Sequence, residues 1–223
     1  MGLELNGKVA MVTGGASGIG EQVVRGLIRT GARVVIVDQN YELASSLESE
    51  LGSQAKAIQV DVTQADQVER AVETIIEIFG SLNLAVNSAG VSGKRETSIE
   101  ELDVEHWKRV IDINLNGTFY CLKYQLKAMK NYSKEGGAIV NMGSILSQVA
   151  VAGSSGYVAS KHALVGLTKA AALENAKNNI RVNLICPGYI DTPLLATGMS
   201  KEFRASLASK HAMGRLGEPQ EIS

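Results

Sequence analysis

The feature that most constrains the fold is a strand, a glycine-rich turn, a helix and a second strand within about 30 residues near the start of the chain. An apolar run at 8–13 leads directly into Gly14-Gly15-Ala16-Ser17-Gly18-Ile19-Gly20, and the helix that follows is expected to end near Thr30. A second apolar run, 33–37, forms the next strand. Glycines at this spacing let a pyrophosphate approach the amides of the helix N-terminus. The unit therefore predicts a dinucleotide site, with a ligand-free glycine turn as the alternative.

Asp38, at the end of that second strand, indicates which dinucleotide is bound. Its carboxylate is placed to accept hydrogen bonds from both hydroxyls of an adenosine ribose and would repel a 2′-phosphate. Gln39 and Asn40 are neutral, and the glycine turn has no Arg or Lys. The predicted cofactor is NAD rather than NADP. The alternative is that Asp38 only caps the helix expected at 41–51.

Strand and helix patterns then alternate to the end of the chain. This alternation predicts an α/β fold: a doubly wound, mainly parallel sheet of Rossmann-like type, flanked by helices, in a single domain. A polar loop is expected at 92–102, and Asp103 is expected to cap a long helix reaching about Lys130. Further strands are expected at 56–60, 84–87, 138–142 and 181–186, and further helices at 68–79 and 157–176. The inner face of the long helix is expected to carry Trp107, Val110, Ile111 and Leu115.

Composition excludes several classes of protein. The 223 residues carry a net charge of −1 and are 45% hydrophobic, which is typical of a globular protein without nucleic-acid partners. The first residues lack the apolar core expected of a signal peptide, and no apolar run reaches membrane-spanning length. Cys121 and Cys186 are expected to be buried thiols in a reducing compartment, which favours a cytoplasmic location. The three histidines do not cluster, so no metal is expected.

Tyr157 and Lys161 are candidate catalytic residues for proton transfer. They lie four residues apart in a helical pattern and therefore on one face of the helix. An ammonium beside a phenol stabilises the phenolate, and each unit of pKa shift is worth about 1.4 kcal/mol. Such a tyrosine can exchange a proton with an alcohol or a carbonyl oxygen. A surface Tyr–Lys pair without function is the alternative.

Together these motifs resemble the short-chain dehydrogenase/reductase family along essentially the whole chain. Thr13-Gly14-x-x-x-Gly18-x-Gly20 is similar to its cofactor loop, Asn87-Ser88-Ala89-Gly90 to its Asn-Asn-Ala-Gly turn, and Pro187-Gly188 to its turn after the sixth strand. Ser88 and Gly143 depart from the usual residues, Asn and Ser. The resemblance implies catalytic roles for Asn114, Ser144, Tyr157 and Lys161. It implies cofactor binding by Gly14, Ser17, Gly18, Ile19, Gly20, Asp38, Asp61, Val62, Asn87, Ala89, Gly90, Tyr157, Lys161, Pro187, Gly188, Ile190 and Thr192.

The resemblance also implies a mechanism. Tyr157 takes the hydroxyl proton of a secondary alcohol while hydride leaves for the nicotinamide, and Ser144 holds the substrate oxygen. Lys161 stabilises the phenolate and reaches the nicotinamide ribose, and Asn114 holds a water that links Lys161 to solvent. Thr192 and the Ile190 backbone hold the carboxamide. Members are commonly tetramers, so a homo-oligomer is expected, with 104–130 and 157–176 at one dimer interface.

Three other functions fit the sequence less well. A non-catalytic NAD-binding regulatory module would be expected to lose Tyr157, Lys161 or Ser144. The epimerase and dehydratase branch shares the Tyr-x-x-x-Lys pair but differs in glycine spacing, and a serine hydrolase lacks its Gly-x-Ser-x-Gly motif here. A 3-oxoacyl thioester reductase of the same family remains an alternative.

The expected substrate loop spans about 188–215. Its apolar residues favour a hydrophobic alcohol or ketone over a phosphorylated or acidic one; the alternative is that some of them pack a lid or a partner subunit. A steroid, an aliphatic or cyclic alcohol, and a 3-oxoacyl thioester all fit. The residues expected to flank the site are Ile145, Leu146, Val149, Val151, Tyr189, Leu194, Leu195, Met199 and Phe203.

The last residues, 214–223, resemble the approach to another helix, with Pro219 suited to its first turn. In the family a helix and one more parallel strand follow. We therefore expect a natural chain some tens of residues longer, because the strand at 181–186 would otherwise have an open apolar edge. The alternative is a true short form in which a partner subunit covers the edge of that strand.

Overall fold

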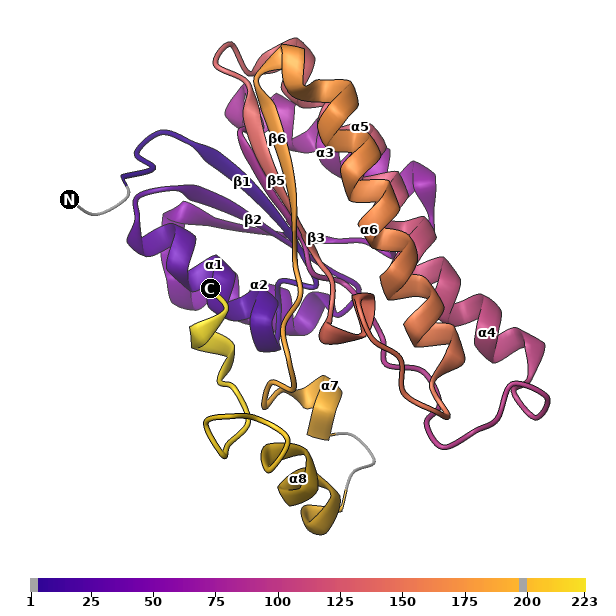
Figure 1. Ribbon diagram of the computed structural model, residues 1–223. Helices are drawn as coiled ribbons and strands as arrows, with labels where there is room; N and C mark the ends of the chain where they lie inside the picture. Colours follow the sequence, from indigo (N-terminus) through magenta and orange to yellow (C-terminus); the bar gives the residue numbers. More distant parts are fainter. Residues whose placement is uncertain (1–3, 197–199) are drawn as a thin grey trace.

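The computed structural model describes residues 4–196 and 200–223. Its centre is a six-stranded, fully parallel sheet with strand order β3-β2-β1-β4-β5-β6 (Figure 1). The order reverses between β1 and β4, as the predicted doubly wound fold requires. The strands are β1 (Val9–Thr13), β2 (Arg33–Asp38), β3 (Ala55–Gln59), β4 (Leu84–Asn87), β5 (Gly137–Met142) and β6 (Ile180–Ile185).

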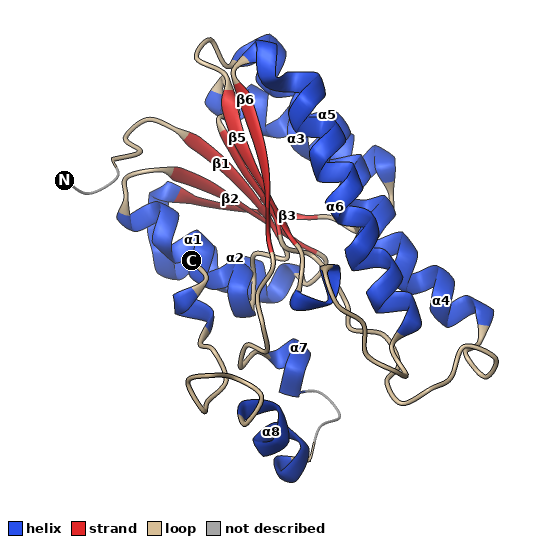
Figure 2. Ribbon diagram, in the orientation of Figure 1, coloured by secondary structure: helices blue, strands red, loops and turns tan. Residues whose placement is uncertain are grey.

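Helices cover both faces of the sheet (Figure 2). One face packs against α1 (Gly18–Arg29) and α2 (Tyr41–Leu51), and the other against α3 (Ala65–Phe79), α5 (Gly117–Tyr132) and α6 (Ser155–Asn175). Burial on both faces explains why β1 is apolar at nearly every position, with all five of its residues buried. The short helices α7 (Pro193–Ala196) and α8 (Lys201–Ala208) lie beyond the end of β6.

The long helix expected after Asp103 is divided in the structure. Asp103 accepts a hydrogen bond from the His106 amide and begins α4 (Val104–Ile111), as predicted. A π-helical turn, Asp112–Asn116, then separates α4 from α5. The extra residue in such a turn rotates the apolar stripe, and π-turns are frequent at functional sites. The prediction that Trp107 faces inward is wrong in part, because Val110 is buried whereas Trp107 is 39% exposed.

A chain of buried amides links the central strands to the helices behind them. Asn87 donates hydrogen bonds to Gln125 Oε1 (3.0 Å) and Asn141 Oδ1 (2.9 Å), and Gln125 returns one to Asn87 Oδ1 (2.8 Å). Asn141 donates in turn to the Thr168 hydroxyl at 2.9 Å. Buried polar groups need such partners, so this network fixes β4 and β5 against α5 and α6.

The segment after β6 crosses the carboxyl ends of the strands and returns toward α1. Ile190 and Gly217 form an isolated parallel bridge, in which Asp191 N donates to Gly217 O at 2.8 Å. A short 3₁₀ turn, Pro219–Glu221, then lies beside α1 (Figure 1). Among the described residues no helix is long and apolar enough to cross a membrane.

Both cysteines are free thiols, but their environments differ. Cys121 is buried in the core, where burial raises the pKa of its thiol to about 12. Cys186 is only partly buried, so the expectation of two buried thiols is wrong for this residue. The reason is its position at the end of the edge strand β6, which has a neighbouring strand on one side only among the described residues.

Candidate active site

A cavity of about 370 Å³ opens at the carboxyl ends of the strands, where the strand order reverses. Ligands of doubly wound sheets bind at this position. Most of the residues expected from the sequence line it. These are Gly14, Ser17, Gly18, Ile19, Gly20, Asp38, Asp61, Val62, Ala89, Gly90, Ser144, Tyr157, Lys161, Pro187, Gly188, Ile190 and Thr192.

The glycine turn between β1 and α1 is built for close backbone approach. A Cβ atom on Gly20 would lie 2.1 Å from the Gly14 carbonyl oxygen, and one on Gly14 would lie 2.8 Å from Ala89 Cα. Gly14 and Gly18 also have φ angles of +62° and +55°, which side chains disfavour. The turn is therefore tight enough to require glycine, and it presents Ser17, Gly18 and Ile19 at the N-terminus of α1 to the cavity, where amides and the helix dipole favour a diphosphate.

Asp38 lies at the same end of the cavity. Its carboxylate accepts hydrogen bonds from Ala16 N (3.1 Å) and Asn40 N (3.0 Å). Asn40, rather than Asp38, caps α2, accepting a hydrogen bond from Leu43 N. The structure therefore does not support the alternative in which Asp38 serves only as the cap. An ionised carboxylate has about four acceptor positions, so two are left for ligand hydroxyls.

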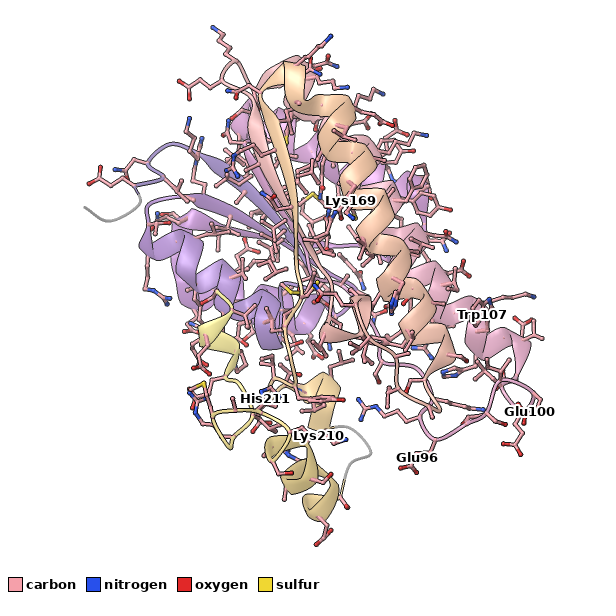
Figure 3. The ribbon with its side chains drawn as sticks, in the orientation of Figure 1. Glu96, Glu100, Trp107, Lys169, Lys210 and His211 are labelled. Atoms are coloured by element: carbon pink, nitrogen blue, oxygen red, sulfur yellow. The ribbon has the colours of Figure 1, made fainter. Side chains whose placement is uncertain are left out.

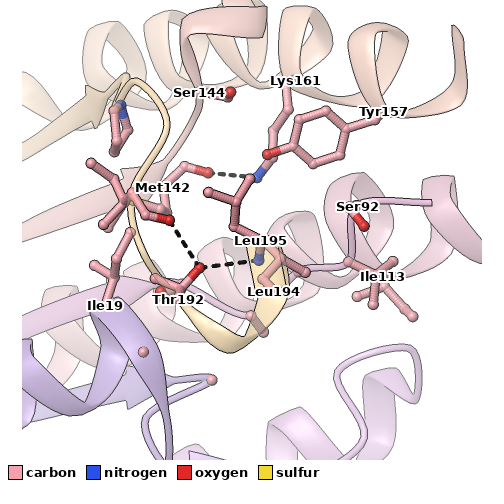
Figure 4. Close-up of a pocket in the computed structure, with 18 of the residues that line it drawn as sticks. Ile19, Ser92, Ile113, Met142, Ser144, Tyr157, Lys161, Thr192, Leu194 and Leu195 are labelled. Carbon is pink, nitrogen blue, oxygen red and sulfur yellow. Dashed lines mark hydrogen bonds between the residues drawn. The ribbon is translucent and has the colours of Figure 1, made fainter. Parts of the chain in front are cut away.

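Tyr157, Lys161 and Ser144 meet at the other end of the cavity (Figure 4). Lys161 Nζ lies 5.5 Å from the centroid of the Tyr157 ring, one turn away on α6. The ammonium donates a hydrogen bond to the Met142 carbonyl oxygen at 2.8 Å. Ser144 follows β5 and accepts a hydrogen bond from Leu146 N at 3.2 Å. Helix α6 and strand β5 thus bring a phenol, a hydroxyl and an ammonium to one place.

The electrostatics differ from the sequence-based expectation. Burial is the largest influence on Tyr157 and raises the pKa of its phenol, while the Ser144 hydroxyl and the charge of Arg95 act in the opposite direction. Burial lowers the pKa of Lys161 to about 8. The expected lowering of the Tyr157 pKa by Lys161 is therefore not found in the cofactor-free protein, because the ammonium is directed to the Met142 carbonyl and is itself desolvated.

Two predicted residues, Asn87 and Asn114, lie behind the cavity rather than on its wall. The Asn87 side chain belongs to the buried amide network described above. Asn114, in the π-helical turn, accepts from Val91 N (2.8 Å) and donates to Val91 O (2.9 Å) and to the Ser160 hydroxyl (3.1 Å). Its amide holds the loop after β4 against α6. A Cβ on Gly90 would lie 3.2 Å from Asn114 Oδ1 and 3.8 Å from Lys161 Nζ.

The segment after β6 closes the cavity. The Thr192 hydroxyl donates to Ile190 O (3.4 Å) and accepts from Leu195 N (3.3 Å) (Figure 4). His211, labelled in Figure 3, packs edge-on against Tyr189 and accepts a hydrogen bond from its amide at 3.1 Å. This contact ties the segment after α8 to the turn that follows β6.

The apolar flank agrees with the sequence in part. Leu146, Val151, Tyr189, Leu194 and Leu195 line the cavity, whereas Ile145 and Val149 do not. Met199 and the side chain of Phe203 lie outside the part of the molecule that the structure describes.

Sequence reasoning missed several lining residues: Val91, Ser92, Arg95, Ile113 and Leu207. Arg95 differs from the others in being charged. It lies in the loop that was expected to be on the polar surface. Nothing in the sequence distinguishes an arginine that lines a cavity there from an arginine that is fully exposed to solvent. Leu207 is buried on α8, but its position in the sequence does not indicate that it lines the cavity.

Comparisons with known proteins agree with this geometry. A family model described as enoyl-(acyl carrier protein) reductase matches residues 14–223. Cyclohexanol dehydrogenase of Acinetobacter sp. is 44% identical, covering 100% of this chain and 87% of that protein. Cis-4-hydroxycyclohexanecarboxylate dehydrogenase of Sinomonas cyclohexanicum is 40% identical, covering 100% and 89%. The crystal structure of 3-ketoacyl-(acyl-carrier-protein) reductase from Brucella melitensis, complexed with NADH, has a TM-score of 0.91 and 32% identity, covering 98% and 88%.

The fold and the cavity define a nicotinamide-dependent oxidoreductase of the doubly wound type. The chain belongs to the short-chain dehydrogenase/reductase family, as the sequence motifs predicted. Its reaction is the interconversion of a secondary alcohol and a ketone.

Proposed function

We propose that the protein oxidises a secondary alcohol with NAD, and reduces the corresponding ketone, using Tyr157 as the acid and base. The observation that carries this proposal is the meeting of Ser144, Tyr157 and Lys161 at one end of a cavity whose other end is the glycine turn and Asp38. A phenol in hydrogen-bonding reach of a substrate oxygen can exchange a proton with it, and the apolar wall excludes competing water.

Each side chain has a distinct role in the proposal. In the oxidative direction Tyr157, as phenolate, accepts the hydroxyl proton of the alcohol. Ser144 donates a hydrogen bond to the same substrate oxygen and so fixes its position. The nicotinamide, when bound, supplies the hydride acceptor or donor. Asn114 is a positioning residue, because its amide is occupied by Val91 and Ser160.

Lys161 has two parts in the proposal. Among the described residues its ammonium donates a hydrogen bond only to the Met142 carbonyl oxygen, which leaves two N–H groups for a ribose hydroxyl. With its pKa lowered to about 8, the amine remains mostly protonated at neutral pH, so the positive charge favours the neighbouring phenolate.

The choice of NAD rests on Asp38. Its two remaining acceptor positions suit the two hydroxyls of an adenosine ribose, and its charge opposes a 2′-phosphate. The fit of the dinucleotide to the glycine turn rests on the tight packing of that turn, which only glycine allows at Gly14 and Gly20, and on the N-terminal residues of α1 that line the cavity beside it. In this proposal Thr192 and the Ile190 backbone, which line the same cavity, hold the carboxamide.

For the substrate we propose a cyclic secondary alcohol. The apolar residues Val151, Leu194 and Leu195 favour a hydrocarbon ring, and the two relatives described above are named for ring alcohols. A 3-oxoacyl thioester is the second candidate, supported by the reductase from Brucella melitensis.

A panel assay tests the proposal. The protein is incubated with NAD and, separately, with cyclohexanol, 4-hydroxycyclohexanecarboxylate and its methyl ester, a hydroxysteroid and a 3-hydroxyacyl thioester, and NADH absorbance is followed. Turnover of at least one ring alcohol is expected. Turnover of the thioester alone would favour the second candidate, and no turnover with any of them would overturn the proposal.

We also propose a cytoplasmic homo-oligomer. The free thiols of Cys121 and Cys186 suit a reducing compartment. Exposed apolar side chains on α5 and α6, such as Phe119 (46% exposed) and Leu173 (82% exposed), suit a subunit interface. Sedimentation analysis should give a dimer or tetramer, and a monomer at micromolar concentration would contradict this.

A further inference from the structure

The substrate end of the cavity has a cation that the proposed mechanism leaves unused. Arg95 lies on the loop between β4 and α4 and lines the cavity together with Tyr157 and Tyr189. Its side chain is partly buried, and its charge interacts with the phenols of those two tyrosines. In the described ranges, 4–196 and 200–223, no carboxylate forms an ion pair with the guanidinium.

The backbone around Arg95 is held in place. The Thr97 hydroxyl donates to the Arg95 carbonyl oxygen at 3.2 Å, and Thr97 N donates to Gly153 O at 3.4 Å. Glu96 has a left-handed φ of 57°, and a Cβ on Gly153 would lie 2.7 Å from Glu96 Cα. This close contact joins the loop to the segment that precedes α6, so Arg95 sits on a fixed support beside Tyr157.

Among the residues that the structure describes, no acidic side chain is paired with Arg95. Asp38 and Asp61 lie at the glycine-turn end of the cavity, and Asp61 accepts hydrogen bonds from the Thr63 amide and hydroxyl. Glu96 also lines the cavity, but it is exposed, lies on the outer part of the loop (Figure 3), and forms no ion pair with Arg95. Burial is the largest influence on the pKa of Arg95 and lowers it, while the phenols of Tyr157 and Tyr189 act in the opposite direction.

A partly desolvated guanidinium beside an apolar wall is suited to a planar anion. It remains charged at any physiological pH, and its paired N–H groups match a carboxylate in a bidentate arrangement. Val151, Leu194 and Leu195 would contact the hydrocarbon part of the same ligand. Lys161, the other cation at this end, is directed to the Met142 carbonyl, so a single positive charge is available, which suits a carboxylate better than a phosphate dianion.

We propose that Arg95 binds a carboxylate carried by the alcohol substrate, so that the preferred substrates are hydroxy acids in which a hydrocarbon ring or chain separates the carbinol carbon from the carboxylate. This inference rests on the proposed oxidation of a secondary alcohol in the cavity, and it revises the sequence-based expectation of an uncharged substrate. Arg95 is a specificity-determining residue in this account, and Tyr157 keeps its role in proton transfer.

The test compares two substrates that differ only in charge, 4-hydroxycyclohexanecarboxylate and its methyl ester. Arg95→Met should lower kcat/KM for the carboxylate at least about tenfold, mainly through KM, and change it little for the ester. Arg95→Lys should restore part of the loss. Lys94→Met is the matched control, because Lys94 is exposed and pairs with Asp103 outside the cavity; it should behave as the wild type.

Binding of cyclohexanecarboxylate to the NAD-loaded protein, measured by calorimetry, separates failure of this inference from failure of the proposed function. Binding that weakens at least about tenfold in Arg95→Met supports the carboxylate site even if no alcohol is oxidised. Alcohol oxidation with carboxylate binding that does not depend on Arg95 overturns the site and leaves the reaction intact. Equal losses for both substrates, with a shifted pH profile, would mean that Arg95 acts only on Tyr157 and would also overturn it.

Discussion

Lys161 Nζ lies 5.5 Å from the centroid of the Tyr157 ring, while its hydrogen bond goes to the Met142 carbonyl oxygen at the end of β5. The phenol and the ammonium thus lie on the same face of α6, but the hydrogen bond of the ammonium goes to Met142 and not to the phenol oxygen. Lys161 is buried, being 5% exposed, and within the described part of the chain no carboxylate forms an ion pair with it. This arrangement has consequences for stability, for cofactor binding and for catalysis.

The first prediction concerns the pH dependence of stability. Burial lowers the pKa of Lys161 from 10.5 to about 8 in the folded protein. Between these values the unfolded chain binds more protons, so the free energy of unfolding of the cofactor-free protein should rise with pH. The full effect is about 3 kcal/mol. Urea unfolding at pH 7, 8 and 9 should show this rise in the wild type relative to Lys161→Met.

Lys161→Met removes the titrating group and keeps most of the side-chain volume. Subtracting the free energy of unfolding of the variant from that of the wild type at each pH therefore removes the contributions of the other titrating groups, including Tyr157. Parallel stability profiles for the two proteins would contradict a lowered pKa for Lys161. The same variant should bind NAD more weakly by at least about tenfold, because it loses a charged donor. Unchanged NAD affinity would remove the ribose role.

The second prediction uses two glycines of α1. Gly20→Ala places a Cβ 2.1 Å from the Gly14 carbonyl oxygen, so the cofactor turn must distort and NAD binding should be lost. Gly26→Ala lies on the same helix, and its Cβ meets no atom closer than 3.7 Å. That control should bind NAD normally, with stability raised by up to about 1 kcal/mol. Equal NAD affinity in the two variants would place the dinucleotide elsewhere.

The third prediction concerns cofactor preference. Asp38→Ser combined with Gln39→Arg removes the carboxylate that opposes a 2′-phosphate and supplies a guanidinium that binds it. The ratio of kcat/KM for NADP over NAD should rise by at least about tenfold. Gln39 lines the cavity next to Asp38, so the arginine is well placed. A ratio that stays constant would show that the adenosine ribose does not lie at Asp38.

Much of the fold and most of the cavity lining could be predicted because their signals are local. The apolar run of β1, the glycines at 14, 18 and 20, and the four-residue spacing of Tyr157 and Lys161 each encode a geometry within one or two elements. Their order along the chain then places them at one edge of the sheet. The predicted strand at 84–87 and helix at 41–51 match the structure to the residue.

What could not be predicted depends on contacts between distant segments. The π-helical turn at 112–116 forms where Asn114 meets Val91 and Ser160, a packing relationship that helical periodicity does not report. The hydrogen bonds of the Asn87 side chain to Gln125 and Asn141 likewise join segments far apart in the sequence, and no local pattern reports them. The pKa of Tyr157 depends on burial and on Arg95, which only the tertiary structure brings together.

Tyr157→Phe tests the central claim most directly. The variant removes one oxygen from a ring that α6 holds in place, so folding and NAD affinity should stay within a few-fold of the wild type. Initial rates of NADH formation from the best alcohol of the panel should fall at least about a thousandfold, because the variant lacks the phenol oxygen that the account assigns as the proton acceptor. A variant that keeps a tenth of the wild-type rate would contradict proton transfer by Tyr157.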